Sequence, residues 1–306
     1  MCSQQSGIVG RPVMADQQVV TIRGSNLGSS ILEEAVIDGF NGSLQGPLIR
    51  PREAGYDDAR KIWNGMIDRR PAFIARFRGV ADVINSVNFT LKHDLLVAVR
   101  AGGHNVAGIA VCDGGLMIDL SEMKSVRVDP VQRTARAEAG VIWGEFVRET
   151  QAFGLAAPGG QISTTGAAGL TLGVGWGHLA RRYGLVSDNL NLCGSGHVER
   201  RFSHRQRNRA PRLILGSTGC NYGVVTSLEY RLHPVGPVLA GIVAYRMEKA
   251  REALCLFRDP TADAPDELAS AIVLITMPDN SRGRYGRLPY RVERGWRAHP
   301  KAPQDL

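Results

Sequence analysis

The order of apolar and polar positions predicts short strands that alternate with amphipathic helices. Apolar residues spaced three and four apart predict helices, and these cover 57–67, 80–92, 141–153 and 250–258. Short apolar or alternating runs predict strands, and these cover 73–77, 95–100, 116–120, 126–129, 134–139 and 223–230. The two runs around Pro130 predict a hairpin.

A glycine-rich loop follows the strand predicted at 95–100. It reads Arg-Ala-Gly-Gly-His-Asn-Val-Ala-Gly over 100–108. Paired glycines let the backbone approach a phosphate, because they lack Cβ and tolerate positive φ. Successive N–H groups in such a turn form a nest for anions. A lone loop histidine is more often a solvated surface residue, so His104 by itself predicts no role.

Glycine is also concentrated beyond this loop. Fifteen glycines lie between Gly102 and Gly177, where average usage predicts about 5. Apolar side chains, serines and threonines are interleaved, which favours a backbone packed around a flat or charged ligand over tight packing alone. A nicotinamide site is not expected, because no helix is predicted after the loop and the GxGxxG spacing is absent.

Composition and charge narrow the class of protein. The 306 residues are 43% hydrophobic and 22% charged, as in a soluble globular protein. With no apolar run of about 18 residues and no signal-like N-terminus, we expect a cytoplasmic protein without membrane contact. The five cysteines lack metal-site spacing, so we expect reduced thiols and no metal.

The basic charge is confined to two segments. The net charge is +8, but residues 199–212 and 282–301 together carry +11, which leaves −3 for the rest. Neither segment contains a recognisable nucleic-acid-binding motif. We therefore expect no nucleic-acid partner.

Several motifs together resemble one family. Residues 99–105, Val-Arg-Ala-Gly-Gly-His-Asn, resemble the Arg-Gly-Gly-Gly-His loop of the berberine-bridge-enzyme-like flavoproteins. These proteins have the FAD-binding domain of p-cresol methylhydroxylase (PCMH) and vanillyl-alcohol oxidase. Further motifs match in order and spacing at 113–121, 158–160, 163–166, 181–185 and 221–226.

The resemblance implies an α+β protein with the PCMH-type FAD-binding fold of two α+β subdomains, and with only the start of the substrate domain. The expected parts are an N-terminal extension (1–45), the FAD-binding domain (46–235) and a truncated substrate domain with a basic tail (236–306). Residues 193–218 and the tail after 279 depart from the family pattern. We hypothesise that reading-frame shifts and early termination produced both departures.

The resemblance also implies FAD as the cofactor, attached covalently to the histidine of the loop. The residues implied to bind FAD are Arg100, Ala101, Gly102, Gly103, His104, Asn105, Gly160, Ser163, Thr164, Thr165, Gly166, Gly169, Gly223 and Val225. Ile162 stands where the family has a second, cysteine tether, so we expect one bond through His104. The catalytic base normally comes from the substrate domain and is not assigned here.

The expected function is an FAD-dependent oxidase or dehydrogenase. It would pass hydride from a small organic substrate to the flavin, with oxygen or another electron acceptor completing the cycle. The alternative is a flavin-binding remnant without turnover. A basic nucleic-acid binder is a third possibility, which the residues do not favour.

Overall fold

The computed structural model describes residues 19–196, 202–206, 223–243 and 245–274. The chain divides into two compact units, 1–234 and 235–306. All the residues of the predicted cofactor site lie in the first unit.

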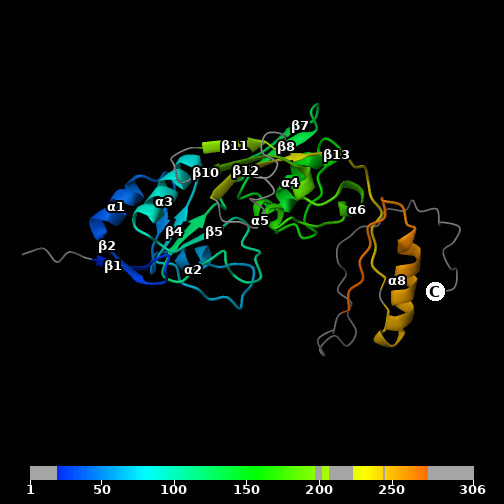
Figure 1. Cartoon of the computed structure of the whole chain (residues 1–306), viewed down its shortest axis with the longest axis horizontal. Helices are drawn as coiled ribbons and strands as arrows, with labels where there is room; N and C mark the ends of the chain where they lie inside the picture. The colour runs from blue at the N-terminus through cyan, green and yellow to red at the C-terminus, as the bar shows by residue number, and fades with distance from the viewer. Residues whose placement is uncertain (1–18, 197–201, 207–222, 244, 275–306) are drawn as a thin grey trace, which may run out of the picture. The chain divides into compact units, whose positions relative to one another are not determined.

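A four-stranded sheet forms one side of the first unit (Figure 1). Its strand order is β3-β4-β6-β5, with β3 (Leu48–Ile49), β4 (Phe73–Arg76), β5 (Val97–Arg100) and β6 (Leu116–Asp119). Strands β4, β5 and β6 run parallel, and β3 is antiparallel to β4. Strand β6 is buried along its length, as expected for a central parallel strand covered on both faces. The predicted strands here are confirmed.

A five-stranded antiparallel sheet forms the other side. Its strand order is β11-β10-β12-β8-β7, with β7 (Val126–Asp129), β8 (Thr134–Glu138), β10 (Leu190–Gly196), β11 (Phe202–Gln206) and β12 (Val224–Arg231). Strands β7 and β8 confirm the predicted hairpin. Two short strands, β9 (Leu155–Ala156) and β13 (His233–Pro234), pair separately.

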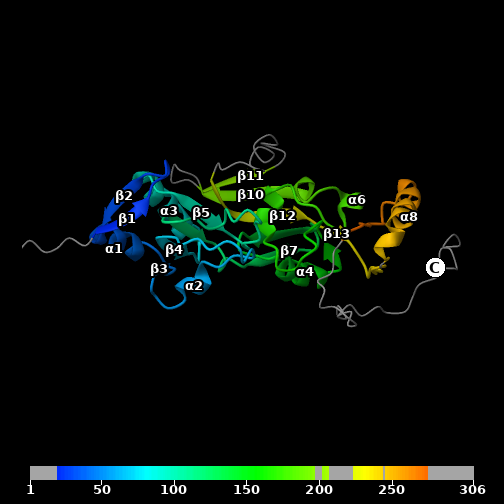
Figure 2. The same cartoon turned by 90° about the horizontal axis from the view of Figure 1, so that it is seen from below.

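Helices connect the two sheets and cover them (Figure 2). Helix α3 (Val80–Lys92), predicted from its apolar spacing, contacts β6 of one sheet and β10 and β12 of the other. Helix α1 (Glu34–Gly42) contacts α3, helix α4 (Trp143–Gln151) contacts β7 and β9, and helix α5 (Ala167–Leu172) contacts β12. Helix α6 (Ala180–Tyr183) and a 3₁₀ turn (Ser187–Asn189) lead into β10.

One hydrophobic core runs through the first unit from Ile22 to Leu232. At its centre the rings of Trp143, Phe146 and Tyr230 pack with centroids 5.1–5.7 Å apart. The Tyr230 hydroxyl lies 2.8 Å from Thr171 Oγ1, so the polar end of this ring is satisfied inside the core. This pairing fixes α5, and with it the loop that precedes α5, against β12.

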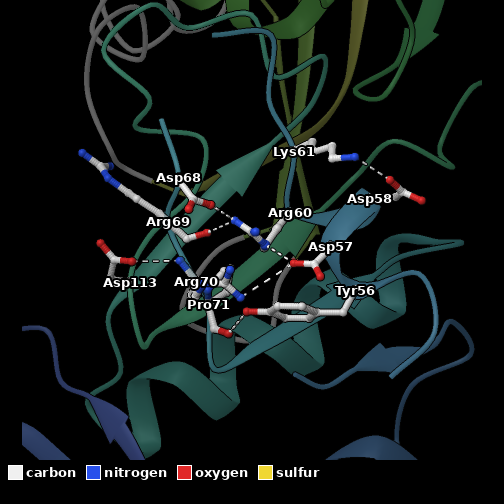
Figure 3. Close-up of polar contacts among 10 residues, drawn as sticks. All are labelled: Tyr56, Asp57, Asp58, Arg60, Lys61, Asp68, Arg69, Arg70, Pro71 and Asp113. Carbon is white, nitrogen blue, oxygen red and sulfur yellow. Dashed lines mark hydrogen bonds and ion pairs between the residues drawn. The ribbon is translucent and has the colours of Figure 1, made fainter. Parts of the chain in front are cut away.

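The predicted helix at 57–67 is wrong in extent. Helix α2 covers only Tyr56–Ala59. Beyond it, Arg60 pairs with Asp57 and Asp68 and donates a hydrogen bond to the carbonyl of Arg69 (Figure 3). Such side-chain bonds to the backbone compete with helical hydrogen bonding, so the segment forms an irregular loop instead.

The weakly patterned N-terminal region contains a hairpin, β1 (Val19–Arg23) and β2 (Ser29–Glu33). It is tied to the four-stranded sheet: Leu96 N–H donates to the Arg23 carbonyl at 2.9 Å, and Arg23 N–H donates to the Gly114 carbonyl at 2.8 Å. Ile22 and Leu32 join the common core. The hairpin therefore packs as part of the first unit.

The second unit contributes a 3₁₀ turn (Met247–Lys249) and helix α8 (Ala250–Ala262), which confirms the helix predicted at 250–258. The tail after 279 lies outside the described residues, as does most of the atypical segment 193–218. Within that segment, β10 and β11 pair in antiparallel register.

A buried carboxylate ties together the carboxyl ends of the three parallel strands. Asp119 is fully buried and accepts hydrogen bonds from Arg76 Nε (2.9 Å), from Arg100 Nε (3.0 Å) and Nη2 (2.5 Å), and from Ser121 N–H (3.0 Å). Burial raises the pKa of Asp119, but the hydrogen bonds and charges of the two arginines outweigh it, so the net pKa lies below the ordinary value. Asp119 is therefore ionised in the folded protein at neutral pH.

We predict that Asp119→Asn lowers the free energy of unfolding by about 3 kcal/mol at pH 7, because it leaves two partly buried guanidinium groups without a counter-ion. The lowered pKa means that the stabilisation is complete at neutral pH and is lost as the pH falls through the folded-state pKa. Urea unfolding at several pH values measures both effects. The control is Asp58→Asn, which removes an exposed ion pair with Lys61. Equal midpoints for both variants would contradict the prediction.

Candidate cofactor-binding site

Two glycine-containing loops from opposite halves of the first unit touch backbone to backbone. The first loop (101–105) follows β5, and the second (159–166) leads into α5. A Cβ added to Gly102 would lie 2.4 Å from the Gly166 nitrogen and 2.5 Å from its Cα. A Cβ on Gly166 would lie 2.6 Å from the Gly102 nitrogen. Only glycine fits at either position.

The first loop presents a row of backbone donors. Gly103 has φ +66°, in the left-handed region, and it packs over the aliphatic part of Arg100. Among the described residues, no protein group accepts a hydrogen bond from the N–H groups of residues 102–105. Successive free N–H groups around a left-handed residue can bind an anion.

The second loop is shaped by one indole ring. The carbonyls of Thr165 and Ser163 accept hydrogen bonds from the N–H groups of Trp143 (2.9 Å) and Gly144 (2.8 Å). A Cβ at Gly159 or at Gly160 would lie 2.8 Å from the Trp143 ring. The glycines predicted to bind a ligand here therefore also let the loop lie flat on this side chain.

The same indole carries an unused donor. Trp143 Nε1 is buried and has no hydrogen-bond partner among the described residues, and it lies beside Gly160, 3.2 Å from where a Cβ would be. An unpaired buried donor costs about 1–3 kcal/mol.

His104 lies where the two loops meet. Its Nε2 is 2.9 Å from Thr164 Oγ1, and its ring stacks on Trp63 with centroids 4.9 Å apart and planes 23° apart. Burial lowers the pKa of His104 below its ordinary value of 6.5. The imidazole is therefore neutral at pH 7 and keeps a nucleophilic lone pair.

The structure brings together Ala101–Asn105 and Ser163–Gly166, as the site predicted from the sequence requires. Other predicted residues lie apart from this meeting point or are otherwise engaged. The Arg100 guanidinium is held by Asp119 and by the Lys61 carbonyl. Gly169 is exposed on α5. Gly223 and Val225, at the start of β12, form no hydrogen bond with the first loop in the described part of the chain, and their roles stay predictions.

Val174, which interrupts the glycine triplet at 173–175, has a strained backbone. Its φ is +76°, a region that a β-branched residue rarely adopts, and such strain costs about 1–3 kcal/mol. Val174 N–H donates to the Thr171 carbonyl (3.1 Å), and the Val174 carbonyl accepts from Ser187 N–H (3.0 Å). The neighbouring Gly175 carbonyl accepts from Val186 N–H (3.1 Å).

Sequence reasoning missed two contributors to this site. Trp63 lies in the segment predicted to be helical, where it counted only as part of an apolar stripe, and no pattern signals its stack on His104. Trp143 was assigned to the buried side of its helix, which the structure confirms, but not to the support of Gly159 and Gly160. Trp143 begins α4, and Gly159 and Gly160 come later in the chain. No local pattern in the sequence links them.

The arrangement fits FAD. The free N–H groups of 102–105 and the exposed hydroxyls of Ser163 and Thr164 supply donors for a diphosphate or for carbonyl oxygens. His104 lies among them. No group of metal-binding side chains occurs within the described part of the chain, and no helix found there is long and apolar enough to cross a membrane.

Comparison with known proteins identifies the domain. Residues 71–192 match the family described as FAD binding domain. An FAD-linked oxidoreductase of Dictyostelium discoideum is 35% identical over 244 residues, which are 78% of this chain and 53% of that protein. The (R)-6-hydroxynicotine oxidase of Paenarthrobacter nicotinovorans is 37% identical over 210 residues, 66% of this chain and 45% of that protein.

Solved structures agree in fold. The crystal structure of 6-hydroxy-D-nicotine oxidase from Arthrobacter nicotinovorans superposes with a TM-score of 0.61 and 38% identity, over 63% of this chain and 43% of that one. The berberine-bridge-enzyme-like protein 1 of Physcomitrella patens gives a TM-score of 0.60 and 25% identity, over 64% and 44%.

The chain thus spans about half the length of the relatives it matches. Residues 71–192 contain both loops of the site and strands β4 to β9, whereas β3, β11 and β12 lie outside the match. Residues 71–192 therefore match an FAD-binding domain, and the chain is similar to FAD-linked oxidoreductases and to a berberine-bridge-enzyme-like protein.

Proposed function

We propose that this protein is an FAD-dependent oxidoreductase in which His104 carries the flavin through a single covalent bond. One observation carries the proposal: the loop with free N–H donors and a neutral histidine meets the Ser/Thr loop at the Gly102–Gly166 contact. When bound, FAD supplies the redox chemistry by accepting hydride from a substrate C–H bond.

The chain's own contribution is to bind and orient the cofactor. The N–H groups of 102–105 would hold the negatively charged diphosphate, and the hydroxyls of Ser163 and Thr164 would donate to its remaining acceptors. Ile162, exposed in the second loop, offers no thiol for a second bond. This leaves His104 as the residue that would prevent loss of the flavin.

We propose that His104 adopts the tautomer in which Nε2–H donates to Thr164 Oγ1, 2.9 Å away. The lone pair is then on Nδ1, because a neutral imidazole carries one proton, so Nδ1 is the nitrogen for attachment. After Nδ1 is substituted and Nε2 has lost its proton, the same hydroxyl can donate to Nε2 instead. Thr164 therefore stabilises the ring before and after the bond forms.

The names of similar proteins suggest the class of substrate. One matched protein is named (R)-6-hydroxynicotine oxidase and another chitooligosaccharide oxidase, so we propose a small organic substrate with oxygen as electron acceptor. A second candidate is flavin binding without turnover, since the matched family covers the FAD-binding part alone. Hydrogen peroxide production from a panel of alcohols, amines and sugars distinguishes the two.

We predict that His104→Ala abolishes covalent flavin. Wild-type protein precipitated with acid should give a yellow pellet, because acid unfolding releases FAD that is bound only by contacts. The His104→Ala pellet should be colourless. His93→Ala, at the end of α3 away from both loops, is the matched control and should stay yellow. A yellow His104→Ala pellet would disprove the attachment site.

We also predict how attachment depends on pH. Only the neutral imidazole has a lone pair for bond formation, and burial lowers the pKa of His104 below 6.5. The rate of covalent incorporation into flavin-free protein should therefore be constant above pH 6.5 and fall as the pH drops through the lowered pKa. FAD binding to His104→Ala over the same range controls for lost affinity. A midpoint above 6.5 would contradict the assignment.

A further inference from the structure

We propose that Trp63 is a positioning residue for His104: it holds the imidazole against Thr164 so that the ring is oriented before the cofactor is attached. This inference rests on the proposed function. It concerns a side chain that supplies no reacting atom.

The exposure of Trp63 indicates a role other than stability. Its side chain is 61% exposed, although tryptophans are highly buried on average. The one aromatic contact recorded for it within the described residues is His104, stacked at 4.9 Å. Thr164 contacts Nε2 of the imidazole, and the Trp63 indole covers one face of the ring. These two contacts limit how the ring can turn, and neither of them engages Nδ1.

Trp63 is itself held by the loop that it supports. Its N–H donates to the Gly103 carbonyl at 3.1 Å, next to His104 in the chain. Asn64 Nδ2 donates to the Val106 carbonyl at 2.8 Å. On the preceding side, Arg100 Nη1 donates to the Lys61 carbonyl at 3.0 Å. The segment 61–64 is therefore bonded to the first loop on both sides of His104.

A second set of bonds anchors the far end of this segment. Arg69 Nη1 donates to the carbonyls of Gly108 (2.9 Å) and Val111 (3.0 Å), and Arg70 N–H donates to Asp113 Oδ1 (2.8 Å). Arg60 in turn donates to the Arg69 carbonyl, and Figure 3 shows this bond together with the one from Arg70 to Asp113. The segment 60–70 is thus hydrogen-bonded to the chain at several points from Arg100 to Asp113, and Trp63 stacks on His104 within that stretch.

The step that this arrangement would serve is covalent attachment of FAD to His104, which forms one bond and breaks two. Nδ1 forms a bond to the 8α carbon of FAD, while one C–H bond of that methyl group and one imidazole N–H bond break. The two electrons released reduce the bound FAD, which takes up the two protons. Oxygen, the acceptor in the proposed function, then reoxidises it and yields hydrogen peroxide. Trp63 contributes by limiting the orientations of the attacking nitrogen.

The test compares Trp63→Ala and Trp63→Phe with wild type, using full-length chain prepared from riboflavin-limited cells. The first readout is the NMR signal of the His104 ring protons before FAD is added, which the indole should shift upfield. The second is the rate of acid-stable FAD incorporation. Phe153→Ala, which removes another exposed aromatic (52%) two residues after α4, is the matched control.

We expect Trp63→Ala to lose the upfield shift and to slow incorporation about 2- to 10-fold, the range that corresponds to loss of one aromatic pair. Trp63→Phe should recover most of both, and Phe153→Ala should change neither. Unchanged incorporation in a folded Trp63→Ala variant would overturn the proposal, as would a Trp63→Phe variant as slow as Trp63→Ala. If wild type incorporates no FAD, the proposed function itself fails and the role in attachment falls with it, while the NMR shift still reports on the ring contact.

Discussion

The close approach of Gly102 to Gly166 is the constraint on which the site depends. These residues belong to loops from different halves of the first unit, one continuing a parallel strand and the other leading into a helix packed on the antiparallel sheet. Their contact places His104 within hydrogen-bonding distance of Thr164. The rest of the fold can be understood as the support that holds the two loops in place.

Each loop has its own foundation. Beneath the first, Asp119 draws together Arg76 and Arg100 at the ends of three parallel strands, so the chain leaves β5 in a fixed direction. Beneath the second, Trp143 provides a flat surface that only glycines can lie against. Asp119 acts through charge and Trp143 through packing, and both side chains are buried in the first unit.

Many of the helices and strands were predictable from the sequence, because an element that is buried on one face carries apolar residues at a regular spacing. The helix at 80–92, the 126–139 hairpin and the absence of a helix after the glycine loop all follow from local pattern. Contacts between distant segments produce no regular spacing and were not predictable. Trp63 stacks on His104, 41 positions later. In place of the helix predicted around Trp63, Arg60 and Arg69 donate hydrogen bonds to carbonyls further along the chain. The sequence predicted that the glycines of the site bind a ligand. It did not predict that Gly102 and Gly166 also pack one loop against the other.

FAD binding by Gly102→Ala tests the central claim most directly. The account predicts that the added methyl, 2.4 Å from the Gly166 nitrogen, separates the loops and abolishes FAD binding while the circular dichroism spectrum stays that of wild type. Gly39→Ala, where a Cβ meets nothing within 4 Å, should bind FAD normally. Wild-type affinity in Gly102→Ala would show that the contact between the two loops does not create the site.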